Sequence, residues 1–259
     1  MIKILLSLVI TTLLLYIAAC GFLYIFQRNF LYYPSEKLEH PFDEIQINND
    51  NDNETVSVIV LNKGNDEALI YFGGNGEAVI NNASNFTSVF TNKTVYLVNY
   101  RGYGGSSGKP TENGIYQDAL TLYDTIKPNH NHISTMGRSL GSGAATYLAA
   151  NRTINKTILI TPYDSIVNVA KNKFKFFPVN LLLKDKFDSA SRAKNIQSEV
   201  LIIAAENDLV IPVARTQALV DAFGDKELTF KIIKGAGHNN LSDSSEYDKA
   251  IERFLLNNY

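Results

Sequence analysis

The pentapeptide Gly137-Arg138-Ser139-Leu140-Gly141 decides the fold of this chain. A short apolar run, residues 133–136, precedes it, and an alanine-rich stretch with helical spacing, residues 142–150, follows it. G-x-S-x-G between a strand and a helix is typical of a sharp turn that holds the serine in a strained backbone conformation. The glycines allow strand and helix to approach closely. The pattern predicts that Ser139 is a nucleophile.

A serine hydroxyl needs a neighbouring base to act as a nucleophile. The chain offers four histidines, His40, His130, His132 and His238. His40 lies in the linker after the hydrophobic N-terminus, and we expect His130 and His132 on the surface, before the strand that leads to Ser139. His238 follows the last apolar strand, where the carboxyl edge of the sheet collects catalytic groups. His238 is therefore the predicted base.

The base needs an acid that fixes its tautomer and stabilises the imidazolium. Asp208 follows an apolar strand and precedes a helix that opens at Pro212. The chain order Ser139, Asp208, His238 is the order expected of an α/β-hydrolase. Glu206 is a rival, but it falls at the strand end, so Asp208 is the predicted acid.

An acyl-transfer site also needs donors for the developing oxyanion. We expect one donor to be the backbone N–H of Leu140, the residue after the nucleophile. The other is expected near Asn75, in the loop Gly73-Gly74-Asn75-Gly76 after the strand at 68–72. A phosphate-binding loop is disfavoured here because no Lys-Ser/Thr pair follows the glycines.

The rest of the chain alternates short apolar runs with helical patterns, which predicts an α/β fold with a mostly parallel central sheet and helices on both faces. The predicted strands are 56–61, 68–72, 95–100, 133–136, 157–160, 200–204 and 229–233, and the predicted helices are 114–126, 142–150, 213–223 and 247–256. Residues 163–198 are the least regular part, with an aromatic cluster at Phe174–Phe177, and are interpreted as a small cap.

The N-terminus carries a run of 23 uncharged residues, Ile4–Phe26, long enough to span a bilayer as a helix. We interpret residues 1–28 as a signal anchor, a single-pass transmembrane helix, and residues 29–259 as the catalytic domain. Two alternatives stay open: a lipoprotein signal ending before Cys20, and a cleaved signal peptide. The positive charges before the span favour an external or periplasmic catalytic domain.

Composition narrows the classes of function. The 259 residues carry a formal net charge of -2 and no long basic stripe, which disfavours nucleic-acid binding. The single cysteine, Cys20, lies in the hydrophobic leader, so the remaining chain has no disulfide and no thiolate metal site. We expect no metal and no cofactor, and the sequence leaves the oligomeric state open.

Several motifs together resemble the membrane-anchored α/β-hydrolases of the abhydrolase-domain type, which share features with prolyl-oligopeptidase-like hydrolases. They are Phe30-Leu31-Tyr32-Tyr33-Pro34, the glycine loop at 73–76, Asn99–Ser106, the serine pentapeptide, the 178–188 stretch, Asp208 with Pro212, and Gly237-His238. The resemblance implies a nucleophile, acid and base at Ser139, Asp208 and His238, and an oxyanion hole at Asn75 and Leu140. One departure is Gly73, where such proteins usually have a histidine.

The sequence thus predicts a serine hydrolase, of carboxylesterase, thioesterase or lipase type, that cleaves an ester or thioester through an acyl-serine intermediate. The anchor and the cap aromatics favour a small-molecule, acyl or lipid-like substrate near a membrane. A serine peptidase-like amidase and a non-catalytic binding protein on the same fold are the alternatives.

Overall fold

The computed structural model describes residues 1–49 and 53–256, and its centre is an eight-stranded sheet with the order β1-β2-β4-β3-β5-β6-β7-β8. β2 pairs antiparallel with β1 and β4, and all the other neighbours are parallel. The strands are β1 Asp43–Asn49, β2 Glu54–Leu61, β3 Glu67–Phe72, β4 Lys93–Val98, β5 His132–Arg138, β6 Lys156–Ile160, β7 Glu199–Ala205 and β8 Thr229–Ile233.

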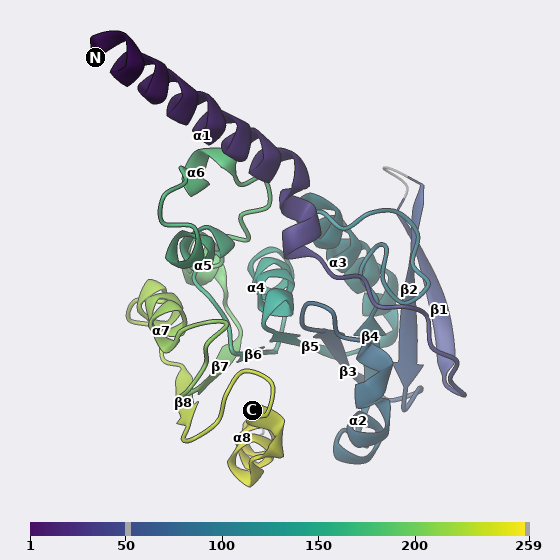
Figure 1. The fold of residues 1–259 in the computed structure, drawn as a ribbon. Helices are drawn as coiled ribbons and strands as arrows, with labels where there is room; N and C mark the ends of the chain where they lie inside the picture. The colour runs from purple at the N-terminus through teal and green to yellow at the C-terminus, as the bar shows by residue number, and fades with distance from the viewer. Residues whose placement is uncertain (50–52, 257–259) are drawn as a thin grey trace.

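Helices cover both faces of this sheet (Figure 1). α3, α4 and α7 lie on one side, and α2 and α8 lie on the other. The helices are α1 Ile2–Leu31, α2 Ala83–Val89, α3 Glu112–Ile126, α4 Leu140–Asn151, α5 Ile166–Lys173, α6 Val179–Leu182, α7 Val213–Ala222 and α8 Ser245–Leu256. Two hydrophobic clusters, one on each face, bury the central strands on both sides. The predicted fold is therefore confirmed.

The burial of the central strands explains why the sequence pattern predicted them. In β3 every residue from Ala68 to Phe72 is buried, and β4 and β6 are buried throughout. A strand that is covered on both faces gains from apolar side chains at every position, so it appears in the sequence as a continuous apolar run. The carboxyl ends of these strands meet at one edge, which carries the loops of the candidate site.

Four elements were not predicted. β1 is an edge strand with one buried apolar side chain, Ile47, so its pattern is weak. α2, α5 and α6 are short, and α5 is largely exposed. The expectation that His130 lies on the surface is wrong: it is buried, and its Nε2 lies 2.7 Å from the hydroxyl of Tyr96. His132 is exposed, as expected.

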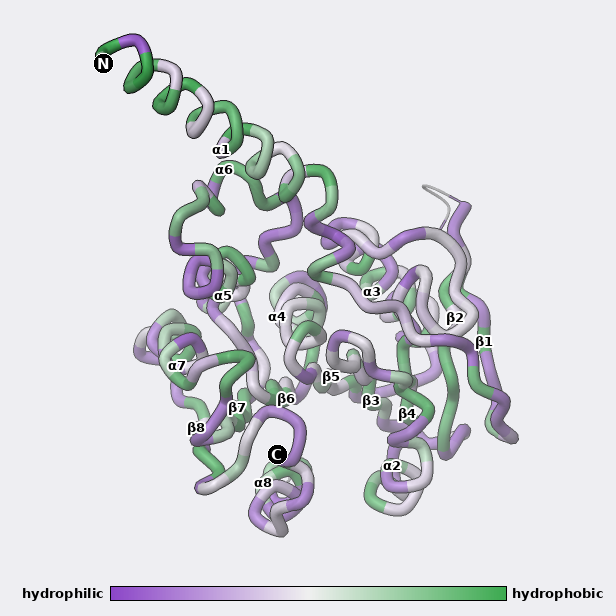
Figure 2. Tube along the Cα trace, viewed as in Figure 1, coloured by the Kyte–Doolittle hydropathy of each residue, from purple (hydrophilic) through white to green (hydrophobic). Residues whose placement is uncertain are grey.

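The N-terminal helix α1 is longer than the uncharged run that predicted it, and it projects away from the sheet (Figure 1). It is apolar along most of its length, as Figure 2 shows, and it is long and apolar enough to cross a membrane. Its second half, from Tyr16 to Arg28, contacts the segment that holds α5 and α6, which we call the cap helices. The contact fixes where the helix leaves the globular part of the chain.

Candidate active site

Ser139 lies on a sharp turn between β5 and α4, with a positive φ of 48°. Few residues with a side chain adopt this backbone conformation, and it is the strained geometry expected of a nucleophile turn. The backbone N–H of Ser139 donates to the carbonyl of Ile160 at 2.8 Å. A Cβ at Gly141 would collide with the carbonyl oxygens of Phe72 and Gly73, so only glycine allows α4 to approach β3 this closely.

The three residues expected to form a triad lie in one hydrogen-bonded chain. The hydroxyl of Ser139 is 3.0 Å from Nε2 of His238, and Nδ1 of His238 is 2.7 Å from Oδ2 of Asp208. Ser139 and Asp208 are buried, and the side chain of His238 is 10% exposed. The geometry allows His238 to take the serine proton on one nitrogen while the carboxylate holds the other.

The second oxygen of Asp208 is held by the backbone that follows it. Oδ1 accepts from the N–H groups of Val210 and Ile211 at 2.8 and 2.7 Å. These bonds leave Oδ2 for His238. The rival acid Glu206 points elsewhere, because its Oε2 accepts from the N–H of Gly235 at 2.8 Å. Glu206 therefore supports the loop that carries His238 and does not contact the imidazole in the described structure.

The loop after β3 lies beside the nucleophile. A Cβ built on Gly74 would be 3.9 Å from Cβ of Ser139, so this backbone passes close to the serine. Leu140 is the first residue of α4, where a helix leaves its N–H groups without intrahelical acceptors. The expected oxyanion donors, the N–H groups of Asn75 and Leu140, thus belong to two segments that meet next to Ser139.

Three polar side chains hold the glycine loop, and the sequence did not single them out. Glu77 accepts from the N–H of Gly74 at 2.6 Å and from the hydroxyl of Tyr71 at 2.7 Å. The hydroxyl of Tyr100 donates to the carbonyl of Gly73 at 2.7 Å. Burial raises the pKa of both tyrosines well above the ordinary range, so both hydroxyls stay protonated and can donate.

The segment just after α1 also reaches this loop. The side-chain oxygen of Asn75 accepts from the N–H of Tyr33 at 3.0 Å and from the hydroxyl of Tyr103 at 2.9 Å. Burial raises the pKa of Tyr103 to about 12, so this hydroxyl is a donor at neutral pH. The Asn75 side chain is thereby fixed from two directions. In this chain, which has Gly73 where abhydrolase-domain proteins usually have a histidine, other side chains thus hold the loop.

Arg138, next to the nucleophile, connects the two loops of the site. Its Nη1 lies 3.7 Å from Oε2 of Glu77, and its Nη2 donates to the carbonyl of His238 at 3.3 Å. The loop after β3 and the loop after β8 therefore share one guanidinium. Among the described residues, no cluster of histidine, cysteine and carboxylate side chains suits a metal ion.

An apolar cavity of about 180 Å³ lies between α1 and the cap helices. It is lined by Leu23, Gln27, Phe30, Leu31, Ile166, Val169, Ala170, Lys173, Phe174, Phe177, Val179, Leu182 and Leu183. None of these residues belongs to the hydrogen-bonded chain at Ser139. The cavity and the candidate catalytic residues are thus separate features, and the cavity is formed in part by the N-terminal helix.

Sheet order, helix layers and the serine turn together define the α/β-hydrolase fold. Solved structures agree: an esterase of Pyrococcus furiosus superposes with a TM-score of 0.68 over 86% of this chain and 97% of its own, at 15% identity. An enol-lactonase of Burkholderia xenovorans superposes with a TM-score of 0.61 over 79% of this chain and 97% of its own, at 17% identity. At these identities the likeness shows the fold alone.

The sequence itself is similar to two kinds of protein. An uncharacterized protein of Mycobacterium tuberculosis is 32% identical over 168 residues, 62% of this chain and 59% of the relative. Human alpha/beta hydrolase domain-containing protein 17B is 30% identical over 174 residues, 63% of this chain and 57% of the relative. The chain therefore spans less than two thirds of these relatives. No family model matches the chain. The expected resemblance to abhydrolase-domain proteins is confirmed, while its prolyl-oligopeptidase-like part stays a prediction.

Proposed function

We propose that this chain is a serine hydrolase that cleaves an ester or thioester through an acyl-serine intermediate. The observation that carries the proposal is the hydrogen-bonded chain from Ser139 through His238 to Asp208. A carboxylate that orients an imidazole next to a strained serine is the arrangement that activates a hydroxyl for acyl transfer. Two of the solved neighbours, an esterase and an enol-lactonase, are named for the hydrolysis of esters, the same chemical class.

The proposed reaction has two halves. The hydroxyl oxygen of Ser139 attacks the substrate carbonyl while Nε2 of His238 takes its proton, and Asp208 stabilises the imidazolium. The N–H groups of Asn75 and Leu140 donate to the tetrahedral oxyanion. His238 then protonates the leaving alcohol or thiol as it departs. Water attacks the acyl-serine by the same route in reverse and releases the acid.

Acyl chains are the proposed substrate class, since the apolar helix α1 and the exposed apolar side chains of the cap suit a lipid-like substrate near a membrane. A series of p-nitrophenyl esters of increasing chain length tests both the activity and this preference. We expect turnover of the short esters and a gain in kcat/KM of about fourfold for each added methylene that becomes buried. If the chain turned over neither oxygen esters nor thioesters, the proposed function would be contradicted.

We also propose that residues 1–28 form a single-pass anchor and that the domain at 29–259 lies on the external face. We expect the full-length chain to stay in the membrane fraction through carbonate washing, because an apolar helix of this length gains far more from lipid than a peripheral contact does. Mass spectrometry of the membrane-bound chain should find Met1 in place. A chain that begins at a diacylated Cys20 would show the lipoprotein alternative to be correct.

Glu77 is proposed as a positioning residue for the oxyanion loop. Both of its carboxylate oxygens accept hydrogen bonds, so the amide of Glu77→Gln must turn an NH₂ group toward a donor. We expect a fall in kcat of roughly tenfold to a hundredfold, the loss typical of a weakened oxyanion donor, with little change in KM.

The matched control for Glu77→Gln is Asp124→Asn, which breaks the pair of Asp124 with Arg152 on the surface. We expect the control to keep wild-type kcat. Affinity for a boronic-acid inhibitor, which binds as a tetrahedral adduct, should fall in Glu77→Gln alone. Equal losses in both variants would show that Glu77 has only a structural role.

A further inference from the structure

The cap contacts α1 well inside its apolar run, Ile4–Phe26. The hydroxyl of Tyr16, in the middle of α1, donates to the carbonyl of Phe176 at 2.9 Å. The ring of Tyr16 stacks on that of Phe177, with centroids 5.8 Å apart and planes 11° apart. The tip of the cap consists of residues 174–182, from the end of α5 to the end of α6. This tip therefore reaches the midpoint of α1.

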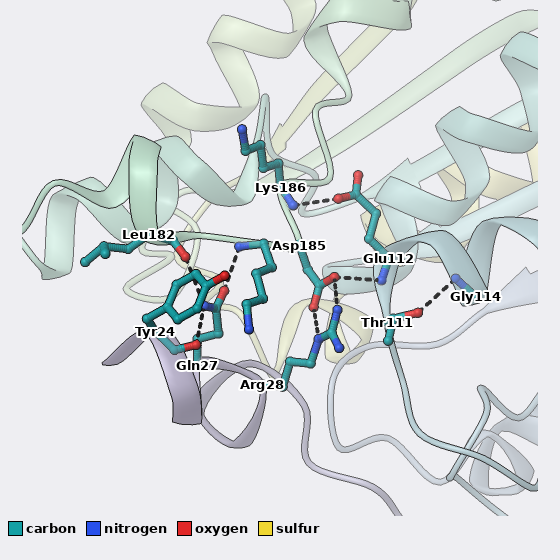
Figure 3. Close-up of polar contacts among 10 residues, drawn as sticks. Tyr24, Gln27, Arg28, Thr111, Glu112, Gly114, Leu182, Asp185 and Lys186 are labelled. Atoms are coloured by element: carbon teal, nitrogen blue, oxygen red, sulfur yellow. Dashed lines mark hydrogen bonds and ion pairs between the residues drawn. The ribbon is translucent and has the colours of Figure 1, made fainter. Parts of the chain in front are cut away.

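A second group of contacts fixes the register of α1 against the cap (Figure 3). Gln27 donates to the carbonyl of Leu182 at 2.9 Å and accepts from the N–H of Lys184 at 2.6 Å. Arg28 forms a two-pronged ion pair with the buried Asp185, at 2.7 and 3.1 Å. Charge-assisted, bidentate pairs are among the strongest side-chain contacts, so α1 cannot slide along the cap without breaking them.

The ion pair is itself tied to the body of the domain. Asp185 also accepts from the backbone N–H of Glu112, at the start of α3, at 3.2 Å. The carboxylate of Glu112 accepts from the N–H groups of Lys186 and Phe187 at 2.6 and 2.9 Å. The last turn of α1, the cap and α3 thus form one connected unit, so the position of α1 in a membrane sets the position of the cap.

The length of α1 sets the depth of the cap tip. A bilayer core of roughly 30 Å takes about 20 helical residues at about 1.5 Å each. Counted from Ile4, that number of residues ends at Leu23, so Tyr16 lies about 10 Å inside the core. If only the residues from Ile4 to Leu15 were in lipid, they would span about 18 Å and could not cross the core.

The side chains at the tip suit lipid. Phe176 is 87% exposed and Leu181 is 81% exposed, and Phe174 is also exposed. Beside them the apolar cavity opens between Leu23 and Phe30 of α1 and Phe177 of the cap. Lys171, Lys173 and Lys175 are interleaved with these side chains and exposed. Long lysine side chains next to apolar anchors can reach the headgroups while the apolar groups stay in the acyl region.

We infer that the cap tip, residues 174–182, is inserted into the same lipid leaflet that α1 crosses, as a second membrane contact. The apolar side chains of the tip and those that line the cavity beside α1 contact the acyl chains of membrane lipids, and Lys171, Lys173 and Lys175 contact anionic headgroups. This inference rests on the proposed anchor. Fixed by α1, the cap holds the domain at the membrane surface, where a lipid-like substrate would leave the bilayer.

The chain contains no tryptophan, so single-tryptophan variants of the full-length protein report on one site each. Phe176→Trp and Leu181→Trp probe the cap tip, and Leu8→Trp probes the anchor. Ile232→Trp is the matched control, because Ile232 is partly exposed on β8, at the far end of the sheet from α1 (Figure 1). Each variant is reconstituted in vesicles of phosphatidylcholine and phosphatidylglycerol, with or without brominated acyl chains.

We expect the tryptophans at positions 8, 176 and 181 to show blue-shifted emission and strong quenching by brominated lipid. The control at 232 should be quenched by iodide in water and not by brominated lipid. If position 8 is quenched and positions 176 and 181 respond only to iodide, the anchor stands and the inference on the cap is overturned.

Two other results would also overturn the inference. Lack of quenching at position 8 would remove the anchor and the inference together. Tryptophans at 176 and 181 that neither quencher reaches would show that a protein surface covers the tip. Ester hydrolysis measured in each variant reports on the proposed activity separately, since none of these positions contacts Ser139, His238 or Asp208 in the described structure.

Discussion

Ser139→Ala is expected to lower kcat/KM for p-nitrophenyl esters by roughly three to six orders of magnitude. The hydroxyl is the only group of this residue that the proposed reaction uses, and without it no acyl-enzyme can form. His238 would still hold its place, because its bond to Asp208 does not involve the serine. The residual rate would come from binding and oxyanion stabilisation of direct attack by water.

The control for this variant is Ser88→Ala, which removes an exposed hydroxyl on α2. We expect wild-type hydrolysis from the control and unchanged thermal unfolding for both variants. Ser139 is buried, but among the described residues its hydroxyl is hydrogen-bonded to His238 alone, so we expect its loss to leave the turn intact. Near wild-type turnover by folded Ser139→Ala would rule out the proposed nucleophile.

Asp208→Asn is expected to lower kcat by about 10⁴-fold, since an amide can present its NH₂ group to Nδ1 and stabilise the wrong tautomer of His238. The side chain would keep its place through the N–H groups of Val210 and Ile211, which still find an oxygen to bind. The fold should therefore survive while the base is disabled.

Glu206→Gln is the matched comparison, because it makes the same chemical change two residues away. Its amide oxygen can still accept from the N–H of Gly235, so the loop of His238 keeps its support. We expect a loss of less than about tenfold, the size of one weakened hydrogen bond. A greater loss in Glu206→Gln than in Asp208→Asn would reverse the assignment of the acid.

The sequence predicted the fold and the candidate triad because both depend on signals local to the chain. Buried parallel strands appear as continuous apolar runs, and their carboxyl ends meet at one edge whatever the intervening sequence does. A serine, an aspartate and a histidine that each follow such a run are therefore brought together by the topology. The structure places Ser139, Asp208 and His238 within one hydrogen-bonded chain.

The supporting residues could not be predicted, because their partners come from distant parts of the chain. Glu77 follows a glycine loop and has no pattern of its own, and its contact with Arg138 depends on β5, which comes much later in the chain. His130 is buried and forms a hydrogen bond with Tyr96, which belongs to β4, 34 residues earlier in the chain. The start of α5 does have a local signal. Ser165 accepts from the backbone N–H of Asn168 and caps α5, and serine is a preferred residue at this position of a helix.

Covalent labelling of the full-length chain with a fluorophosphonate, followed by peptide mapping, tests directly whether Ser139 is the nucleophile. A fluorophosphonate reacts with a serine that a neighbouring base and an oxyanion hole have activated. We expect a single adduct, on Ser139, and strongly reduced labelling in Asp208→Asn with little reduction in Glu206→Gln. No adduct on the folded chain, or an adduct on a different serine, would contradict the claim that Ser139 is the nucleophile.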